Sequence, residues 1–123
     1  MRKNFGAQSD VYPMPVFIVA AYDENGNPNC MNAAWGGIYE DKQIMVCLSH
    51  GHKTTQNIKA SKAFTVSIAD AKHVVEADYV GVVSGNNEPD KMGKAGLTTC
   101  KSEFVNAPGI NEVPMTVECN RLK

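Results

Sequence analysis

Runs of β-branched and aromatic residues, separated by turn signals, make up the first third of the chain. The segment 15–22 (PVFIVAAY) is apolar and stops at DENGNPN, where Asn25-Gly26 is typical of a hairpin turn. The following segment 30–35 contains weaker strand formers and runs into Gly36-Gly37. The pattern predicts a strand, a turn and a second strand whose backbone is approached closely by another group.

The middle of the chain alternates between strand and helix patterns. The apolar run 43–49 (QIMVCLS) predicts a strand that is buried on both faces, with the thiol of Cys47 in the core. The segment 50–62 predicts a short helix that opens near Ser49 to His52. Apolar residues then alternate with Thr65, Ser67 and Ala69 over 62–70, which predicts a strand with one core face and one polar face.

The last fifty residues predict two helical segments and two strands. Apolar residues recur every three or four positions over 72–84, which indicates an amphipathic helix with Gly85 after its end as the C′ residue. The apolar positions are Val75, Tyr79, Val82 and Val83. A further helical turn over 90–95 is closed by Gly96. Two strands are expected at 100–105 and 113–119, around a loop at Pro108-Gly109.

These elements indicate one domain over residues 1–123, mainly β with helical insertions, of the α+β or barrel type. The chain ends just as the last expected strand ends, so an unpaired edge is expected. Either the chain is shortened or a partner chain covers that edge.

Composition narrows the classes of function. The 123 residues are 43% apolar and carry a net charge of −1, so no basic surface is available to attract nucleic acid or an anionic membrane. The longest apolar run is far shorter than the roughly 20 residues that a membrane span needs. We therefore expect a soluble, unexported, cytoplasmic protein. Its four cysteines show no CxxC or zinc-ribbon spacing, which indicates a reducing compartment without disulfides.

The stretch LSHGHKTTQNI holds the first candidate for chemistry. A helix N-terminus offers unpaired N–H groups and partial positive charge, and Lys53, Thr54 and Thr55 add a cation and hydroxyl donors there. This combination predicts a phosphate site, and the alternative is an ordinary helix start with a solvated lysine. His50 and His52 have no acidic or thiol ligand at a metal-binding spacing, so no metal site is predicted.

The stretch CMNAAWGG is the second candidate. Small residues let a planar ligand approach the chain, and Asn32 offers both a carbonyl and an amide. Trp35 is either a core anchor or a ligand contact. Lys91 is either a solvated surface charge or a cation that faces the electron-rich edge of a cofactor. No nucleophile–base pair, P-loop, Rossmann fingerprint or GxSxG motif is present, which argues against hydrolases and kinases.

Five segments follow one another in a recognisable order. They are PMPVFIVAAYDENGNPNCMNAAWGG, LSHGHKTTQNI, FTVSIADAKHVVEADYVGVVSG, DKMGKAG and PGINEVP. In this order the chain resembles the flavin reductase-like family with an FMN-binding split barrel, and especially its flavoredoxin branch. The resemblance covers roughly residues 4–119. It implies an antiparallel split β-barrel of the Greek-key type, a homodimer, and FMN held noncovalently at the dimer interface.

The resemblance also implies roles for individual residues. Asn29, Asn32, Ala33, Ala34 and Trp35 are similar to the strand that lines the isoalloxazine ring. Ser49, Lys53 and Thr54, with His52 or Thr55 as further candidates, correspond to the phosphate side of the cofactor. Lys91 corresponds to a family lysine near the flavin. The flavin carries the chemistry, so no catalytic side chain is implied.

Three functions follow from the resemblance and stay open. The first is an oxidoreductase that takes electrons from NAD(P)H through FMN and passes them to free flavin or another acceptor. The second is a flavoredoxin-like FMN carrier that passes electrons between protein partners. Family members usually continue with further strands, so this chain is expected to lack the C-terminal part of the barrel. The third function is therefore a shortened, flavin-free split-barrel module.

Overall fold

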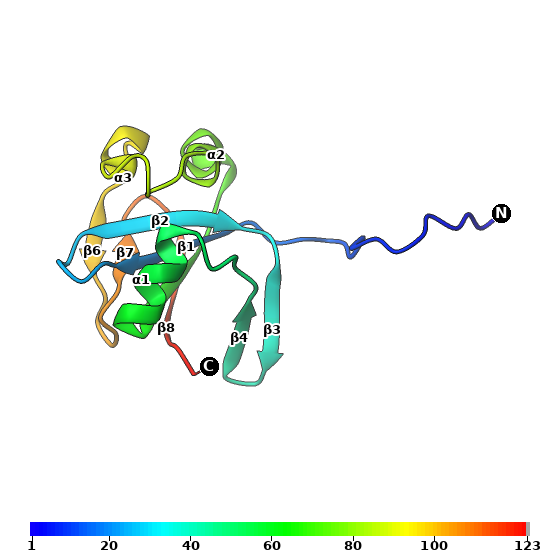
Figure 1. Cartoon of the computed structure of the whole chain (residues 1–123), viewed down its shortest axis with the longest axis horizontal. Helices are drawn as coiled ribbons and strands as arrows, with labels where there is room; N and C mark the ends of the chain where they lie inside the picture. The colour runs from blue at the N-terminus through cyan, green and yellow to red at the C-terminus, as the bar shows by residue number, and fades with distance from the viewer. Residues whose placement is uncertain (123) are drawn as a thin grey trace.

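A four-stranded antiparallel sheet forms the centre of the computed structural model, which describes residues 1–122 (Figure 1). The strands lie in the order β2-β1-β5-β8. They are β1 (Phe17–Tyr22), β2 (Pro28–Ala33), β5 (Ala63–Ile68) and β8 (Met115–Asn120). The strands predicted around 15–22, 62–70 and 113–119 are therefore confirmed, although β1 and β5 lie side by side and the chain does not run as a simple meander.

The predicted hairpin between β1 and β2 is also confirmed. Tyr22 pairs with Pro28, and the turn is held by the Asp23 carboxylate, which accepts hydrogen bonds from the backbone N–H groups of Asn25 and Asn27. Gly26 has φ +81°, a conformation that glycine adopts without strain. The second strand ends at Ala33, so the segment 34–35 lies outside it.

A second hairpin, β3 (Gly36–Glu40) and β4 (Gln43–Val46), extends from the end of β2. The strand β3 was not predicted. Gly36 is required because a Cβ there would lie 2.5 Å from the backbone oxygen of Met45, so the close approach comes from the paired strand. The prediction that β4 is buried on both faces is wrong. Met45 and Cys47 are exposed, because β4 has core residues on one face only.

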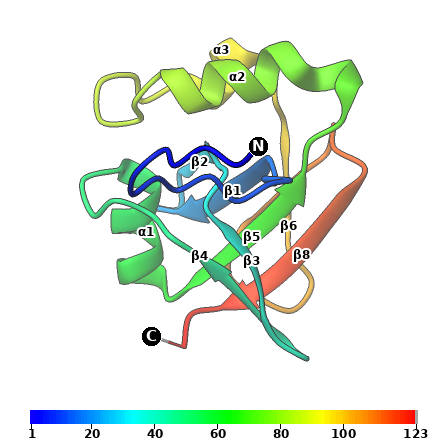
Figure 2. The same cartoon turned by 90° about the vertical axis from the view of Figure 1, so that its right-hand side faces the viewer.

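The helices cover the two faces of the central sheet (Figures 1 and 2). The elements are α1 (Lys53–Ser61), a 3-10 turn η1 (Ala71–His73), α2 (Val74–Val82) and α3 (Lys91–Ala95). On one face α1 packs with Val19, Ala21, Phe64 and Val66 around Ile58. On the other, α2 and α3 pack on Ile18, Ala20 and Cys30 through Ala77, Val80 and Met92. The strand β2 therefore has α1 on one side and α2 on the other.

The position of α2 is as predicted, but its buried face is not. Val75 and Val82 are 74% and 75% exposed, whereas Ala77 and Val80 are buried. The small side chain of Ala77 lets α2 approach β2 closely enough for its carbonyl to accept a hydrogen bond from that strand. Gly85 is not the C′ residue, because the helix ends in extended backbone at Val83.

The region from α3 to β8 combines correct and incorrect predictions. Gly96 closes α3 with φ +76°, as expected. The strand predicted at 100–105 is shorter, β6 (Thr99–Lys101), and Pro108-Gly109 belongs to the buried strand β7 (Pro108–Ile110), not to a loop. The polar face of β5 is buried as well, because Thr65 donates to the Pro108 carbonyl and β8 covers Ser67.

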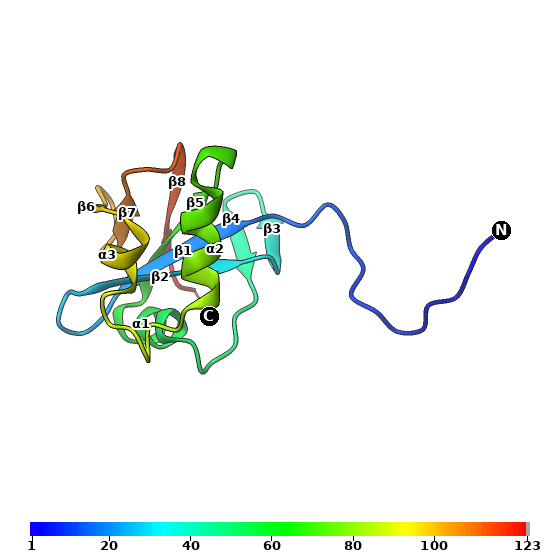
Figure 3. The ribbon, with the colours of Figure 1, turned by 90° about the horizontal axis from the view of Figure 1, so that it is seen from above.

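Residues 1–16 form an arm without helix or strand that extends away from the domain (Figure 3). The arm carries exposed apolar side chains at Phe5, Val11 and Tyr12. Across residues 1–122, no helix combines the length and the apolar character needed to cross a bilayer.

Candidate cofactor-binding site

A buried hydrogen bond joins β2 to the first turn of α1. The Asn29 side-chain amide donates to the hydroxyl of Thr54 over 2.7 Å, and both side chains are buried. The two segments that sequence analysis singled out separately therefore meet in space. Thr54 is held by this bond at the point where the helix begins.

The start of α1 has the properties that anion binding requires. His52 is the N-cap, and within residues 1–122 its side chain makes no capping hydrogen bond. No acidic residue lies in the first turn, and Lys53 is its first residue. The N–H groups of this turn therefore remain available, and no carboxylate within the turn itself offsets the partial positive charge of the helix end. Ser49 and His52 are exposed beside it.

Two buried polar groups on α1 lack hydrogen-bond partners in the described part of the chain. They are the Thr55 hydroxyl and the side-chain Nδ2 of Asn57. An unsatisfied buried donor costs about 1–3 kcal/mol, so such groups mark places where a ligand or water completes the structure. Thr55 was a predicted site residue, whereas Asn57 was missed. Its spacing of four residues from Lys53 is the sequence signal that places both on one face of the helix.

A polar cavity of about 750 Å³ lies beside this face of α1. Lys53, Asn57 and Asn29 line it from α1 and β2. Its other walls come from the β1–β2 turn, the loop after α2, and α3 with the segment that follows; they include Asp23, Asn27, Gly85, Asn86, Asp90 and Thr98. Hydrogen bonds from Asn27 and Asn25 lower the pKa of the Asp23 carboxyl, so this group is ionised at neutral pH.

The far end of β2 carries the rest of the predicted ring-binding strand. Asn32 donates through Nδ2 to the carbonyl of Ala77 in α2 over 3.0 Å, and Ala33 is buried. Ala34 is exposed and Trp35 is 59% exposed. Trp35 is therefore not a core anchor, and its indole is free to contact a ligand. The backbone carbonyl of Trp35 accepts a hydrogen bond from the Cys47 N–H over 2.7 Å, which places Trp35 next to the segment that leads to Ser49.

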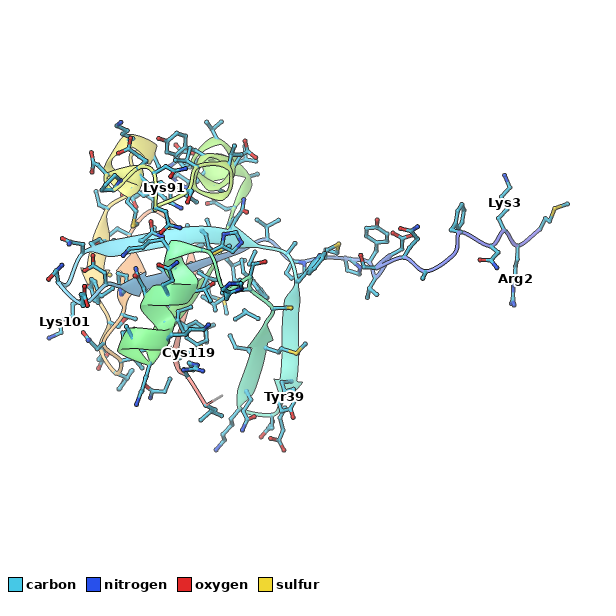
Figure 4. The ribbon with its side chains drawn as sticks, viewed as in Figure 1. Arg2, Lys3, Tyr39, Lys91, Lys101 and Cys119 are labelled. Carbon is cyan, nitrogen blue, oxygen red and sulfur yellow. The ribbon has the colours of Figure 1, made fainter. Side chains whose placement is uncertain are left out.

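Lys91 is the first residue of α3, and it lies between α3 and α2 on the side that faces β2 (Figure 4). It is 2% exposed, and its Nζ donates to the carbonyls of Val80 and Val83 over 3.1 and 2.9 Å. The interpretation of Lys91 as a solvated surface charge is therefore wrong. Burial lowers the pKa of its ammonium group, partly opposed by the nearby Cys30 thiol. The amine caps the C-terminal end of α2, and the residue does not line the polar cavity.

A larger and mainly apolar cavity, about 1270 Å³, lies between the β3–β4 hairpin, α1 and β8. Among the predicted site residues that the structure describes, Thr55 lines this second cavity and none of the others does. The helix α1 therefore separates a polar cavity from an apolar one. In residues 1–122, no three His, Cys, Asp or Glu side chains are grouped as a metal site would need.

Comparison with known structures identifies close likenesses. Flavoredoxin of Desulfovibrio vulgaris (Miyazaki F) is 41% identical with a TM-score of 0.95, over 100% of this chain and 68% of that chain. Flavoredoxin from Methanosarcina acetivorans is 25% identical with a TM-score of 0.81, over 97% of this chain and 64% of the other. These likenesses confirm the predicted fold, a mainly β, antiparallel split barrel with a few helices.

Two curated relatives are uncharacterized proteins of Aeropyrum pernix and Aquifex aeolicus, 29% and 26% identical over 110 and 120 residues. The chain spans 41% and 61% of their lengths, and the matches cover 88% and 92% of this chain. The family model described as the flavin reductase like domain matches residues 9–123. The chain therefore belongs to the flavin reductase-like family.

Proposed function

We propose that the chain binds FMN noncovalently and transfers electrons through it. The observation that carries the proposal is the uncapped N-terminus of α1, with Lys53 in its first turn and a polar cavity beside it. The unpartnered amide of Asn57 in the wall of that cavity supports the fit of a ligand with hydrogen-bonding groups. A bound flavin would supply the electron-accepting ring, which no side chain provides.

The residues divide into two groups under this proposal. Lys53, Thr54 and the first-turn N–H groups hold the phosphate, with Ser49, His52 and Thr55 nearby. Asn29, Asn32 and the segment 33–35 line the ring. The two groups adjoin because Asn29 is hydrogen-bonded to Thr54. Lys91 positions the end of α2, which packs on β2 through Asn32.

The electron donor distinguishes two versions of the proposal. Membership of the flavin reductase-like family supports an oxidoreductase that takes electrons from NAD(P)H. The 41% identity to a protein called flavoredoxin supports a carrier that exchanges electrons with protein partners. Steady-state oxidation of NADH and NADPH with added FMN separates them. A flavin-dependent rate above background favours the reductase, and FMN reduction by a redox protein alone favours the carrier.

We further propose a homodimer, for which the exposed apolar residues of the arm are the structural support. Sedimentation of the purified chain tests the dimer. An absorbance spectrum between about 300 and 550 nm, taken after incubation with FMN and desalting, tests the cofactor.

A pair of lysine variants makes the cofactor test sharper. Lys53→Ala removes the cation from the first turn of α1, while Lys59→Ala removes one from its last turn. A charge-assisted phosphate contact contributes about 1.5–3 kcal/mol, so Lys53→Ala is expected to weaken FMN binding about ten- to a hundredfold. Lys59→Ala is expected to leave it unchanged. Equal effects of the two variants, or none, would contradict the phosphate assignment.

A further inference from the structure

The arm, residues 1–16, exposes large apolar side chains that nothing in residues 1–122 covers. It contains no helix or strand and points away from the domain (Figure 3). Its side chains of Phe5, Val11 and Tyr12 are 74%, 76% and 75% exposed. Removing apolar surface of this size from water is favourable, so the arm is suited to dock on a second apolar surface.

The mainly apolar cavity of about 1270 Å³ between the β3–β4 hairpin, α1 and β8 is such a surface. Ile44, Ile58 and Phe64 line it from three different elements. Ile38 and Tyr39, on the hairpin side, also line it and are 87% and 66% exposed. The strand β8 lies at the edge of the described sheet and pairs there with β5 alone. We call this region the hairpin groove; it is apolar, open and lined by a free sheet edge.

The arm leaves its own sheet at the end opposite to the part of β5 and β8 that lines the hairpin groove. It joins β1 at Phe17, which pairs with Ile68 of β5. The groove is lined instead by Phe64 of β5 and by its partner on β8, Cys119. Four residues of strand, about 13 Å, separate the two positions on β5. The segment 13–15 contains two prolines, which restrict the backbone at the base of the arm. The geometry therefore favours the groove of a second copy over the arm's own groove.

The charges indicate how an arm lies in the hairpin groove. Arg2 and Lys3 stand at the free end of the arm (Figure 4). At the tip of the β3–β4 hairpin, Glu40 and Asp41 line the groove and outnumber Lys42. At the end formed by α1 and β8, the cations that line the groove outnumber the anions. Opposite charges therefore direct the free end of the arm toward the hairpin tip, while the apolar side chains supply most of the binding free energy.

The area that the arms can cover is close to what a specific dimer needs. An aromatic side chain buries about 150–250 Å² when it is covered completely. Two arms carry four such side chains, Phe5 and Tyr12 twice, at 74% and 75% exposure. Together with the groove surface that they cover, they bury roughly 900–1,500 Å², and Val11 adds to this area. Specific protein interfaces bury about 1,200–2,000 Å².

We propose that the arm of one copy docks in the hairpin groove of a second copy, and that the second arm docks in the first groove in return. A two-fold axis makes both contacts identical, so that each copy covers the other's arm and groove at once. This inference rests on the homodimer of the proposed function and names the two surfaces that form it.

Disulfide cross-linking between two singly substituted proteins tests the docking directly. One carries Val11→Cys in the arm and the other Ile38→Cys in the groove, both in a background in which the exposed Cys47 and Cys100 are replaced by serine. Mixed under mild oxidation without flavin, they are expected to cross-link about fivefold more than Val11→Cys mixed with Val82→Cys, because docking raises the effective concentration of the two thiols. Val82 is the matched control, since it is 75% exposed on α2 and does not line the groove.

Three patterns of cross-linking overturn the inference, and mass spectrometry of the linked peptides identifies them. Equal yields at the groove and control positions mean that the arm does not prefer the groove. Disulfides that join Val11→Cys only to another Val11→Cys mean that the arms meet each other. In a chain that carries both Val11→Cys and Ile38→Cys, a disulfide within the chain and none between chains assigns the arm to its own groove.

Sedimentation of three variants tests the contribution of the docking to the dimer. Phe5→Ser with Tyr12→Ser removes both aromatic side chains of the arm, and Ile38→Asp places a charge in the groove. These residues are exposed in the single chain, so the fold is expected to stay intact, which circular dichroism checks. Each change is expected to raise the dissociation constant of the dimer about a hundredfold, and Val82→Asp to leave it unchanged.

The same measurements separate this inference from the proposed function. If the arm and groove variants stay as dimeric as the unaltered chain, the homodimer stands, but its interface lies elsewhere and the inference is wrong. If the unaltered chain is monomeric at every concentration, both the homodimer and the inference are wrong. Neither measurement contains flavin, so FMN binding is tested independently of the docking.

Discussion

Gly81 lies inside α2 with the side chain of Asn32 directly against it. A methyl group at Gly81 would overlap the terminal amide of Asn32. That amide also donates to the Ala77 carbonyl, so it cannot move aside without giving up a partly buried hydrogen bond. The substitution Gly81→Ala therefore tests how firmly β2 and α2 are joined.

Two opposing effects determine how much Gly81→Ala changes the free energy of unfolding. Alanine is about 1 kcal/mol more favourable than glycine inside a helix. Against this, overpacking costs about 1–3 kcal/mol and the displaced hydrogen bond about 1 kcal/mol more. The free energy of unfolding is therefore expected to fall by about 1–3 kcal/mol in Gly81→Ala. In an Asn32→Ala background the overlap is gone, and Gly81→Ala is expected to raise the free energy of unfolding by about 1 kcal/mol.

Urea denaturation of the four proteins in this cycle, followed by circular dichroism, measures the coupling. The change of sign between backgrounds corresponds to a coupling of about 2–4 kcal/mol. If Gly81→Ala stabilises both backgrounds by the same amount, Asn32 does not pack against α2 as described. The two single variants serve as internal controls, since each alters one side of the contact.

Three further predictions concern other parts of the fold. Lys91→Met leaves the carbonyls of Val80 and Val83 without their donor, so we expect about 1–3 kcal/mol less stability in urea, and an unchanged midpoint would contradict the capping role. Burial raises the pKa of Glu112, but hydrogen bonds from Thr98 outweigh this and lower it overall, so Glu112 stabilises the fold above its ordinary pKa and loses this effect as the pH falls through the lowered value. Glu112→Gln should therefore be less stable than wild type above the ordinary glutamate pKa of 4.5, and the difference should shrink as the pH falls below it. A difference that stays constant with pH would refute the linkage. Cys47 is expected to react rapidly with a thiol reagent, whereas Cys30, buried with its pKa raised to about 12, should react only on unfolding; mass spectrometry of the labelled peptides decides.

The local sequence pattern was sufficient to predict a structural feature where that feature depends on residues close together in the chain. The β1–β2 hairpin, the start of α1 and the closure of α3 at Gly96 all follow from turn chemistry and periodicity. The buried face of α2 did not, because Ala77 faces β2 through a hydrogen bond that only the tertiary structure reveals. Val82 is as apolar as any core residue, yet nothing in the described chain covers it.

The same distinction holds for the candidate site. Lys53 and Thr54 could be identified because a helix start is a local feature. The surroundings of Lys91 could not, since its partners lie at the end of α2 and just after it, eleven and eight residues earlier in the chain. Asn57 was missed because an asparagine in a helix gives no sign of whether its amide finds a partner.

The uncapped start of α1 also links ligand occupancy to the motions of the backbone. Without a side-chain acceptor from His52, the N–H groups of the first turn open to solvent more easily than those of the turns that follow. An anion that accepts hydrogen bonds from these N–H groups stabilises the helical conformation of the first turn. Slower hydrogen exchange at the first turn of α1 thereby reports that the site is occupied, even when the ligand absorbs no visible light and is not converted by the protein.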